Sequence, residues 1–150
     1  MDDFESDDEI MKLAIAREED ANKFFLALAA RVKNPEMRKV FEDLADEELE
    51  HKARLELEIM KKGRVVTATE KLELEEEAET EVVRQMLDMD YKDMLLMGMQ
   101  KEESSFRLYV DLAARVSGED AYETILALAE EEVKHKMRFE IEYDSLMKSR

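Results

Sequence analysis

The sequence predicts an all-α fold, a four-helix bundle made of two helical hairpins joined by a long crossover. Helix breakers are scarce in the 150 residues, with three glycines and one proline, while 42% of the residues are charged and 45% are hydrophobic. Such a composition, in long stretches without breakers, is typical of helices. The chain also repeats itself at a shift of 84 positions, because residues 45–52 match residues 129–136 and residues 28–32 match residues 112–116. The repeat indicates two similar hairpins.

Capping residues and breakers set approximate bounds for the four helices. Ser6 is placed to begin a capping box, and Asn34 with Pro35 is typical of a tight corner between two helices. Gly63 is expected to end the second helix, and Asp90 to cap the third. Four helices of roughly 40 Å are therefore expected, at residues 7–33, 35–62, 91–117 and 119–148.

The crossover covers residues 63–90, which is too long for a hairpin loop. We expect it to run the length of the bundle and to start the third helix beside the first or the second. Residues 78–89 are compatible with a further helix, and the acidic run 73–81 is interpreted as a solvated charge run. The methionines between Met86 and Met99 are interpreted as packing residues. Exchange of a hairpin between two chains would satisfy the same pattern.

Composition excludes several classes of function. A net charge of −17 argues against binding to nucleic acid or to an anionic membrane, because both require a basic surface. With no cysteine, the chain has no disulfide, thiol catalysis or iron–sulfur centre. It contains no apolar run long enough to span a membrane, and its first residues do not resemble a signal peptide. We therefore expect a cytoplasmic protein.

An apolar stripe runs along each predicted helix, and each stripe contains one glutamate near its middle. The first stripe contains Met11, Ala14, Glu18, Ala21, Phe25, Leu28 and Val32, and the third contains Leu95, Gly98, Glu102, Ser105, Tyr109, Leu112 and Val116. The second stripe contains Phe41, Leu44, Glu48, His51 and Leu55, and the fourth contains Ile125, Leu128, Glu132, His135 and Phe139. Glu19 and Glu103 share their faces with charged residues, so we expect them at the surface.

Both histidines of the chain follow a glutamate by three residues, in Glu48-x-x-His51 and Glu132-x-x-His135. This spacing places a carboxylate and an imidazole one turn apart on the same helix face, where both can reach one metal ion. Four buried carboxylates would repel one another and lose hydration, whereas two divalent cations would cancel their charge. Oxygen and imidazole donors with open positions suit iron or manganese and disfavour a closed structural zinc site. We expect Gly98 to have a packing reason, of which room for such a metal pair is one.

At these residues the chain resembles the rubrerythrin branch of the ferritin-like di-iron carboxylate proteins. The resemblance covers nearly the whole chain outside the crossover, and it implies a ferritin-like bundle that holds two iron ions, with manganese or zinc as possible replacements. It also implies that Glu48 and Glu132 bridge the metals. The six ligands that it implies are Glu18, Glu48, His51, Glu102, Glu132 and His135. Rubrerythrins proper carry a further glutamate three residues after the third-helix ligand, where this chain has Ser105.

The resemblance implies reduction of peroxide or O2 coupled to the oxidation of Fe2+, with Tyr109 as a candidate catalytic residue that donates a hydrogen bond or takes part in redox chemistry. Tyr109 is also compatible with a packing role. Because the chain has no cysteine-ligated rubredoxin domain, we expect an external electron donor such as a rubredoxin-type protein. Iron handling without turnover, a metal-dependent hydroxylase and a metal-free helical scaffold are the other functions considered.

Apolar residues beside the main stripes predict that the protein is a homodimer. Phe24 and Leu26 extend the apolar surface of the first helix, and Phe106 and Val110 extend that of the third.

Overall fold

The computed structural model describes residues 6–61 and 90–148 of the chain, which fold into four helices and, over these residues, no strand. The helices are α1 (Asp7–Arg31), α2 (Pro35–Met60), α4 (Tyr91–Arg115) and α5 (Glu119–Lys148). All four begin at the residues predicted from the sequence. The first three end two residues before their predicted ends, and α5 ends where predicted. The predicted all-α, four-helix bundle is confirmed.

The predicted capping residues begin three of the helices. The side chain of Ser6 accepts a hydrogen bond from the backbone N–H of Glu9 (3.2 Å), and the side chain of Asp90 accepts one from that of Asp93 (2.9 Å). Asn34 accepts hydrogen bonds from the next helix at two backbone N–H groups, with Pro35 in its first turn. These side chains satisfy backbone donors that have no partner inside the helix.

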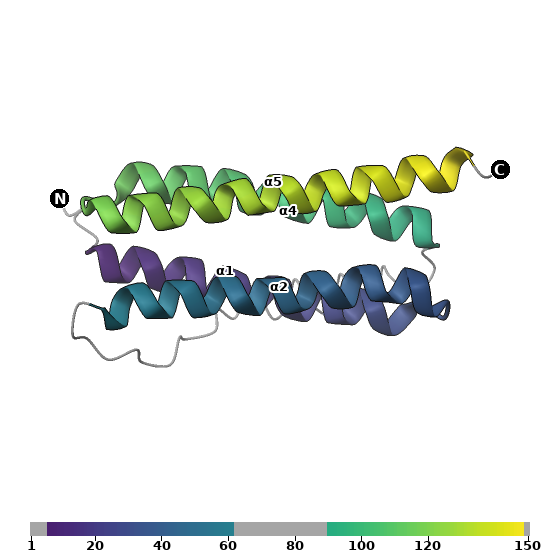
Figure 1. Ribbon diagram of the computed structural model, residues 1–150, viewed down its shortest axis with the longest axis horizontal. Helices are drawn as coiled ribbons and strands as arrows, with labels where there is room; N and C mark the ends of the chain where they lie inside the picture. The colour runs from purple at the N-terminus through teal and green to yellow at the C-terminus, as the bar shows by residue number, and fades with distance from the viewer. Residues whose placement is uncertain (1–5, 62–89, 149–150) are drawn as a thin grey trace.

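The two hairpins pack side by side to form the bundle (Figure 1). α1 packs against α2, α4 packs against α5, and the hairpins meet through α1 against α4 and α2 against α5. α2 ends and α4 begins at opposite ends of the bundle (Figure 1), as the long crossover predicted, and α4 lies beside α1. Some predicted features lie outside the described residues, namely Gly63, the acidic run 73–81, Met86 and the possible helix at 78–89.

Two hydrophobic clusters occupy the two halves of the bundle. One cluster is formed mainly of aliphatic residues. It contains residues from the N-terminal halves of α1 and α5 and from the C-terminal halves of α2 and α4. The other contains Phe25, Phe41 and Phe139 and occupies the opposite half of each helix. The glutamates and histidines of the four stripes fall between these clusters in every helix. They therefore lie in a polar layer with an apolar core on both sides, which excludes water from it.

Gly98 has a packing reason, as expected, but the group for which it makes room is an aromatic ring and not a metal pair. A Cβ atom at Gly98 would lie 2.7 Å from Cζ of Phe139. The Phe139 ring packs against the rings of Phe25 and Phe41, with centroid distances of 5.7 and 5.8 Å. The glycine allows the ring to lie close against α4, one turn away from the polar layer.

Within the described residues, no helix combines the length and the apolar character needed to cross a membrane.

Candidate metal centre

The six residues predicted as metal ligands come together at mid-length of the bundle. Glu18 is on α1, Glu48 and His51 are on α2, Glu102 is on α4, and Glu132 and His135 are on α5. The four glutamates are 0% exposed, and the two histidines are 2% and 4% exposed. The spacing of three residues in α2 and α5 turns each imidazole to the same side as the preceding carboxylate. Residues from all four helices therefore form one buried polar cluster.

The cluster consists of two overlapping groups of donor atoms. The first is formed by Glu18, Glu48, His51 and Glu132, and the second by Glu48, Glu102, Glu132 and His135. Within each group the donor atoms lie within 4.8 Å of one another. Donors bound to one ion at 2.0–2.2 Å are at most about 4.4 Å apart, so each group is close to the size of an ion's ligand shell. Glu48 and Glu132 belong to both groups, as expected of carboxylates shared by two ions.

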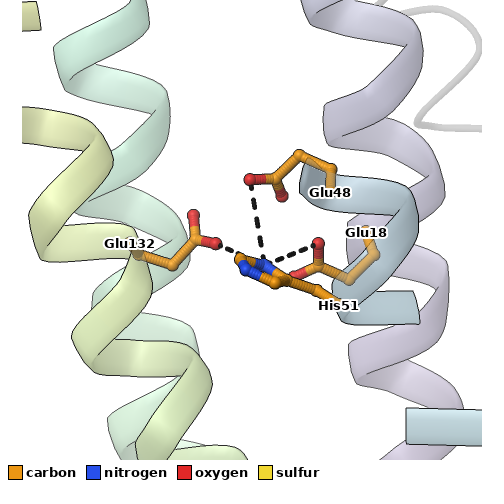
Figure 2. A group of neighbouring side chains, drawn as sticks. All are labelled: Glu18, Glu48, His51 and Glu132. Atoms are coloured by element: carbon orange, nitrogen blue, oxygen red, sulfur yellow. Dashed lines mark ion pairs between the residues drawn. The ribbon is translucent and has the colours of Figure 1, made fainter. Parts of the chain in front are cut away.

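The imidazole rings face the carboxylates with their Nδ1 atoms. Nδ1 of His51 lies 3.4 Å from Oε2 of Glu18, 4.0 Å from Oε1 of Glu48 and 3.2 Å from Oε1 of Glu132. Figure 2 shows the Glu132 side chain reaching this nitrogen from the opposite hairpin.

The second imidazole repeats this arrangement and also contacts the first. Nδ1 of His135 lies 3.1 Å from Oε1 of Glu48 and 3.2 Å from Oε2 of Glu102. The two rings stack nearly parallel, with an angle of 4° between their planes and 5.4 Å between their centroids. The two halves of the internal repeat thus contribute matching sides of the cluster.

Six of the eight carboxylate oxygens of the cluster lack the hydrogen bonds that buried oxygens normally make. Among the described residues, both oxygens of Glu48 and of Glu132 have no hydrogen-bond partner, and neither do Oε2 of Glu18 and Oε1 of Glu102. Buried polar atoms without partners destabilise a fold, and such a concentration of them requires an explanation. Divalent cations would satisfy these oxygens and neutralise their charge. The donor set therefore fits two divalent metal ions.

Burial and mutual repulsion shift the pKa values of most of the carboxyl groups upward. Burial, with the neighbouring Glu48 carboxylate, raises the pKa of Glu18 well above its usual range. Burial and the contact with Glu102 do the same to the pKa of Glu132, and burial also raises the pKa of Glu102. Without metal, these carboxyl groups favour the protonated state.

The pKa values of Glu48 and His135 shift so as to favour the charged form of each group, because the two side chains contact each other. Burial alone would raise the pKa of Glu48, but the close contact between its Oε1 atom and Nδ1 of His135, at 3.1 Å, and the charge of the imidazolium lower that pKa below its usual value. Burial likewise opposes protonation of His135, whereas contacts with Glu102 and Glu48 raise its pKa to about 11. Glu48 and Glu132 occupy equivalent positions in the repeat, yet their environments differ.

The sequence analysis missed Glu47, which lies on the outer side of the cluster. Its Oε2 atom is 3.2 Å from Nε2 of His135, and its side chain is 43% exposed. A carboxylate beside the outer nitrogen favours this ring orientation, in which the other nitrogen points into the cluster. The signal in the sequence is the repeated doublet Glu47-Glu48 and Glu131-Glu132, whose first members lie outside the apolar stripes.

Tyr109 lies in direct contact with the cluster. Its hydroxyl is buried and donates a hydrogen bond to Oε1 of Glu18. Ser105 is also buried but turns away from a ligand role, because its hydroxyl accepts a hydrogen bond from Nε of Arg17 at 3.2 Å. Nη2 of Arg17 also donates to Ser104 at 2.7 Å. A neutral hydroxyl and a cation therefore stand where rubrerythrins proper carry a further glutamate.

The fold and the cluster together define a helical-bundle protein with a buried carboxylate–histidine metal centre. The family model of rubrerythrin matches residues 9–143, so the chain belongs to the rubrerythrin family. This finding confirms the resemblance seen in the sequence.

Two solved structures share the fold. A candidate ferritin-like diiron-carboxylate protein of Thermotoga maritima is 21% identical, with a TM-score of 0.70, over 94% of this chain and 96% of its own. A hypothetical protein of Pyrococcus furiosus is 23% identical, with a TM-score of 0.67, over 97% of this chain and 92% of its own. At these identities the likeness establishes the ferritin-like fold. A search of curated proteins found no significant match.

Proposed function

We propose that the chain is a non-haem di-iron carboxylate protein that reduces peroxide or O2 with oxidation of Fe2+. The observation that carries the proposal is the set of buried carboxylate oxygens without partners, arranged as two overlapping groups of donor atoms. Two divalent ions carry four positive charges, which balance four carboxylates with both imidazoles neutral. Hard oxygen donors with one nitrogen for each ion favour iron or manganese over a structural zinc.

Each residue has a distinct part in holding the metals. Glu18 and His51 would hold one ion and Glu102 and His135 the other, while Glu48 and Glu132 would contact both. Bound iron would supply the electrons that reduce a small oxidant. The apolar cores on both sides of the cluster keep bulk water away, so that charges in the site are weakly screened.

Tyr109 acts in this proposal as a positioning residue. Its hydroxyl donates to one oxygen of Glu18, which leaves the other oxygen, Oε2, directed at the cluster. Glu47 has the corresponding part for His135, because its carboxylate lies at the outer nitrogen of the ring. The hydroxyl of Tyr109 also places a proton next to the site, where reduction of an oxidant consumes protons.

Turnover requires electrons from outside the chain. We propose a separate donor, such as a rubredoxin-type protein, because the chain has no cysteine and so no iron–sulfur centre of its own. A cytoplasmic location is part of the same proposal.

Iron handling without turnover is the second candidate function. The observation that favours it is the pair of Ser105 and Arg17, which puts a neutral hydroxyl and a cation at a position that holds a carboxylate in rubrerythrins proper. A site without this further carboxylate stabilises oxidised iron less than a site that has it. Steady-state consumption of peroxide with a reductant separates the two functions.

The test of metal binding uses a double variant and a matched control. Replacement of both Glu48 and Glu132 by Ala should abolish iron binding, which elemental analysis measures. It should also abolish the ultraviolet absorbance that appears after aerobic addition of Fe2+. Replacement of Glu19 and Glu103 by Ala is the control, because these glutamates are also equivalent in the repeat but pair with surface lysines at 3.0 Å. About two irons per chain in the control and none in the double variant are expected. Iron content unchanged in the double variant would refute the proposed site, and a folded wild type that binds no metal would leave only the scaffold function.

A further inference from the structure

The two sides of the metal centre contribute unequal numbers of ligands. α2 and α5 pack against each other and each contributes a glutamate and a histidine, whereas α1 and α4, which also pack together, contribute one glutamate each. Each group of donor atoms comes from four residues, so an iron or manganese ion held by it would keep positions open to a further ligand. Because the chain supplies fewer donors from α1 and α4, a further ligand is best accommodated on that side.

A buried hydroxyl group lies on that side of the cluster. Ser105 follows Glu102 by three residues on α4, its side chain is 1% exposed, and it accepts a hydrogen bond from Nε of Arg17 at 3.2 Å. A hydroxyl group that accepts one hydrogen bond can still donate its own hydrogen, and the described residues provide no acceptor for that hydrogen. Ser105 is therefore free to donate to a bound ligand.

Arg17 carries a charge that no neighbouring carboxylate balances. Its guanidinium group donates to two serine hydroxyls, from Nε to Ser105 and from Nη2 to Ser104 at 2.7 Å. Among the described residues, no carboxylate forms an ion pair with it. Arg17 is half-buried, and a charge removed from water without a partner of opposite sign is destabilising. The guanidinium group is therefore suited to an anion from outside the chain.

The internal repeat shows how the equivalent cation is balanced in the other half of the chain. A shift of 84 positions relates Arg17 to Lys101 and Asp20 to Ser104. The ammonium group of Lys101 forms an ion pair with the Asp20 carboxylate, and both side chains are largely buried, with 16% and 13% exposure. The packing of α1 against α4 thus accommodates an acid at this position. Since Ser104 replaces the acid beside Arg17, the charge of Arg17 remains available.

The charge of Arg17 matters most when metal ions are bound. In the metal-free protein, the four carboxylates of the cluster balance it at longer range. Two divalent ions would cancel the charge of these carboxylates, and the polar layer would then keep the single positive charge of Arg17. Charges interact strongly in such a weakly screened environment. One monovalent anion between the metal ions and the guanidinium group would restore neutrality.

The donors on this side fit a small carboxylate. A guanidinium group has five N–H donors in a plane that matches the two oxygens of a carboxylate, and Arg17 uses two of them for the serines. Iron and manganese also accept carboxylate oxygen as a ligand. Ser104 is exposed, so an anion can approach Arg17 from solvent, whereas the burial of Ser105 excludes a large anion.

We propose that Arg17 and Ser105 form a subsite for a small carboxylate, of the class of formate or hydrogencarbonate, which binds together with the metal ions and completes their ligand shell. This inference rests on the proposed function, because it requires divalent ions in the cluster. The binding of the anion and the binding of metal are then coupled, and each raises the affinity of the protein for the other by the same factor.

Calorimetric titration with Co2+ measures this coupling without a redox reaction. Replacement of chloride by formate at equal ionic strength should raise the Co2+ affinity of the wild type by at least about fivefold, the lower end for coupled ligands. Hydrogencarbonate is tested in the same way, and the anion with the larger effect is the preferred source of the carboxylate group. Co2+ binding that neither anion strengthens would overturn the inference and leave the metal centre. Absence of Co2+ binding in every solution would refute the metal centre and the inference with it.

Two variants and a matched control assign the effect to Arg17. Arg17→Gln removes the charge, and Ser104→Asp gives Arg17 a carboxylate within the chain, as Asp20 does for Lys101. Both variants should bind Co2+ but lose the response to formate, and Ser104→Asp changes only an exposed position, so it tests the inference even if Arg17→Gln does not fold. Lys101→Gln is the control, because it removes the equivalent charge in the other half, and it should keep the response. A response that persists in Ser104→Asp, or that Lys101→Gln loses, would refute the assignment.

Ser105→Glu distinguishes a ligand role of the anion from a general effect of charge. The new side chain would place a carboxylate of the chain itself at the proposed subsite, beside Arg17. This variant should bind Co2+ in chloride about as tightly as the wild type does in formate, and formate should add nothing further. A full response to formate in Ser105→Glu would show that the anion binds elsewhere and would overturn the subsite.

Discussion

Replacement of Glu132 by Gln should stabilise the metal-free protein at neutral pH while removing its response to metal. Glutamine has the same shape but does not ionise, so it relieves the repulsion and the loss of hydration that raise the pKa of Glu132. The two oxygens of Glu132 are buried without partners, and a buried group without partners costs more when it is charged than when it is neutral, here by an amount on the order of 1–3 kcal/mol. For a chain of this size 1 kcal/mol corresponds to about 2–4 °C, so the melting temperature should rise by roughly 2–12 °C.

The pH dependence of this difference identifies its cause. A carboxyl group whose folded pKa is raised contributes stability below its unfolded pKa, and this stability is lost as the pH rises through the folded pKa. The usual glutamate pKa is 4.5, so Glu132→Gln and wild type should melt at similar temperatures near pH 4. The gap should widen as the pH rises towards 7. Circular dichroism of metal-free samples at several pH values measures it, and a gap that does not change with pH would refute the electrostatic explanation.

Glu48→Gln is the matched control, because its position is equivalent to that of Glu132 and its pKa is shifted in the opposite direction. A lowered folded pKa contributes stability above the unfolded pKa, which is lost as the pH falls through the folded pKa. Glu48→Gln removes this contribution together with the contact to His135, so it should lower the melting temperature at pH 7. Added Fe2+ at a hundredfold excess over Kd should stabilise the wild type by about 2.7 kcal/mol and neither variant appreciably. Equal shifts of both metal-free variants would refute the assignment of charges in the cluster.

Three further substitutions test individual contacts. Tyr109→Phe should lower the free energy of unfolding by about 1 kcal/mol and slow the oxidation of added Fe2+; an oxidation rate equal to wild type would show that the hydroxyl has no part in positioning Glu18. Gly98→Ala should destabilise the protein by about 1–3 kcal/mol in chemical denaturation, because the new Cβ would lie 2.7 Å from the Phe139 ring. The free-energy cost of this overpacking is larger than the gain in helix propensity. A stabilised variant would show that the ring moves freely. Glu47→Ala should weaken metal binding by roughly tenfold. This is the low end of the losses of metal affinity expected when a residue that contacts a ligand is removed, because Glu47 is partly exposed. Unchanged metal affinity in a titration would contradict the orienting role.

The repeat and the stripes explain why so much of the site could be predicted. Glu18 and Glu102 are the acidic members of otherwise apolar stripes, and helical periodicity alone separates them from Glu19 and Glu103 on the surface. The two Glu-x-x-His motifs occupy the same register in both halves of the chain. Such patterns depend only on the geometry of single helices, which local sequence determines.

Contacts between helices could not be predicted in the same way. A packing role for Gly98 was predicted, but its partner was not, because the ring that fills its space, Phe139, comes from another helix, 41 residues later in the sequence. Glu47 was missed because its place beside His135 depends on how α2 packs against α5. The replacement of a further glutamate by Ser105 was visible in the sequence, but the partner of that serine, Arg17, was not.

The sequence by itself determined the four helices, their caps and the six residues that point into the bundle, because periodicity and capping act within a few residues along the chain. Tertiary structure alone decided that α4 lies beside α1. It also brought donor atoms of Glu48 and Glu132 into both groups, as the family resemblance implied. It also decided that these two equivalent glutamates have opposite pKa shifts. Electrostatic interactions in a buried layer depend on distances between atoms from different helices, and these distances exist only once the two hairpins have packed together.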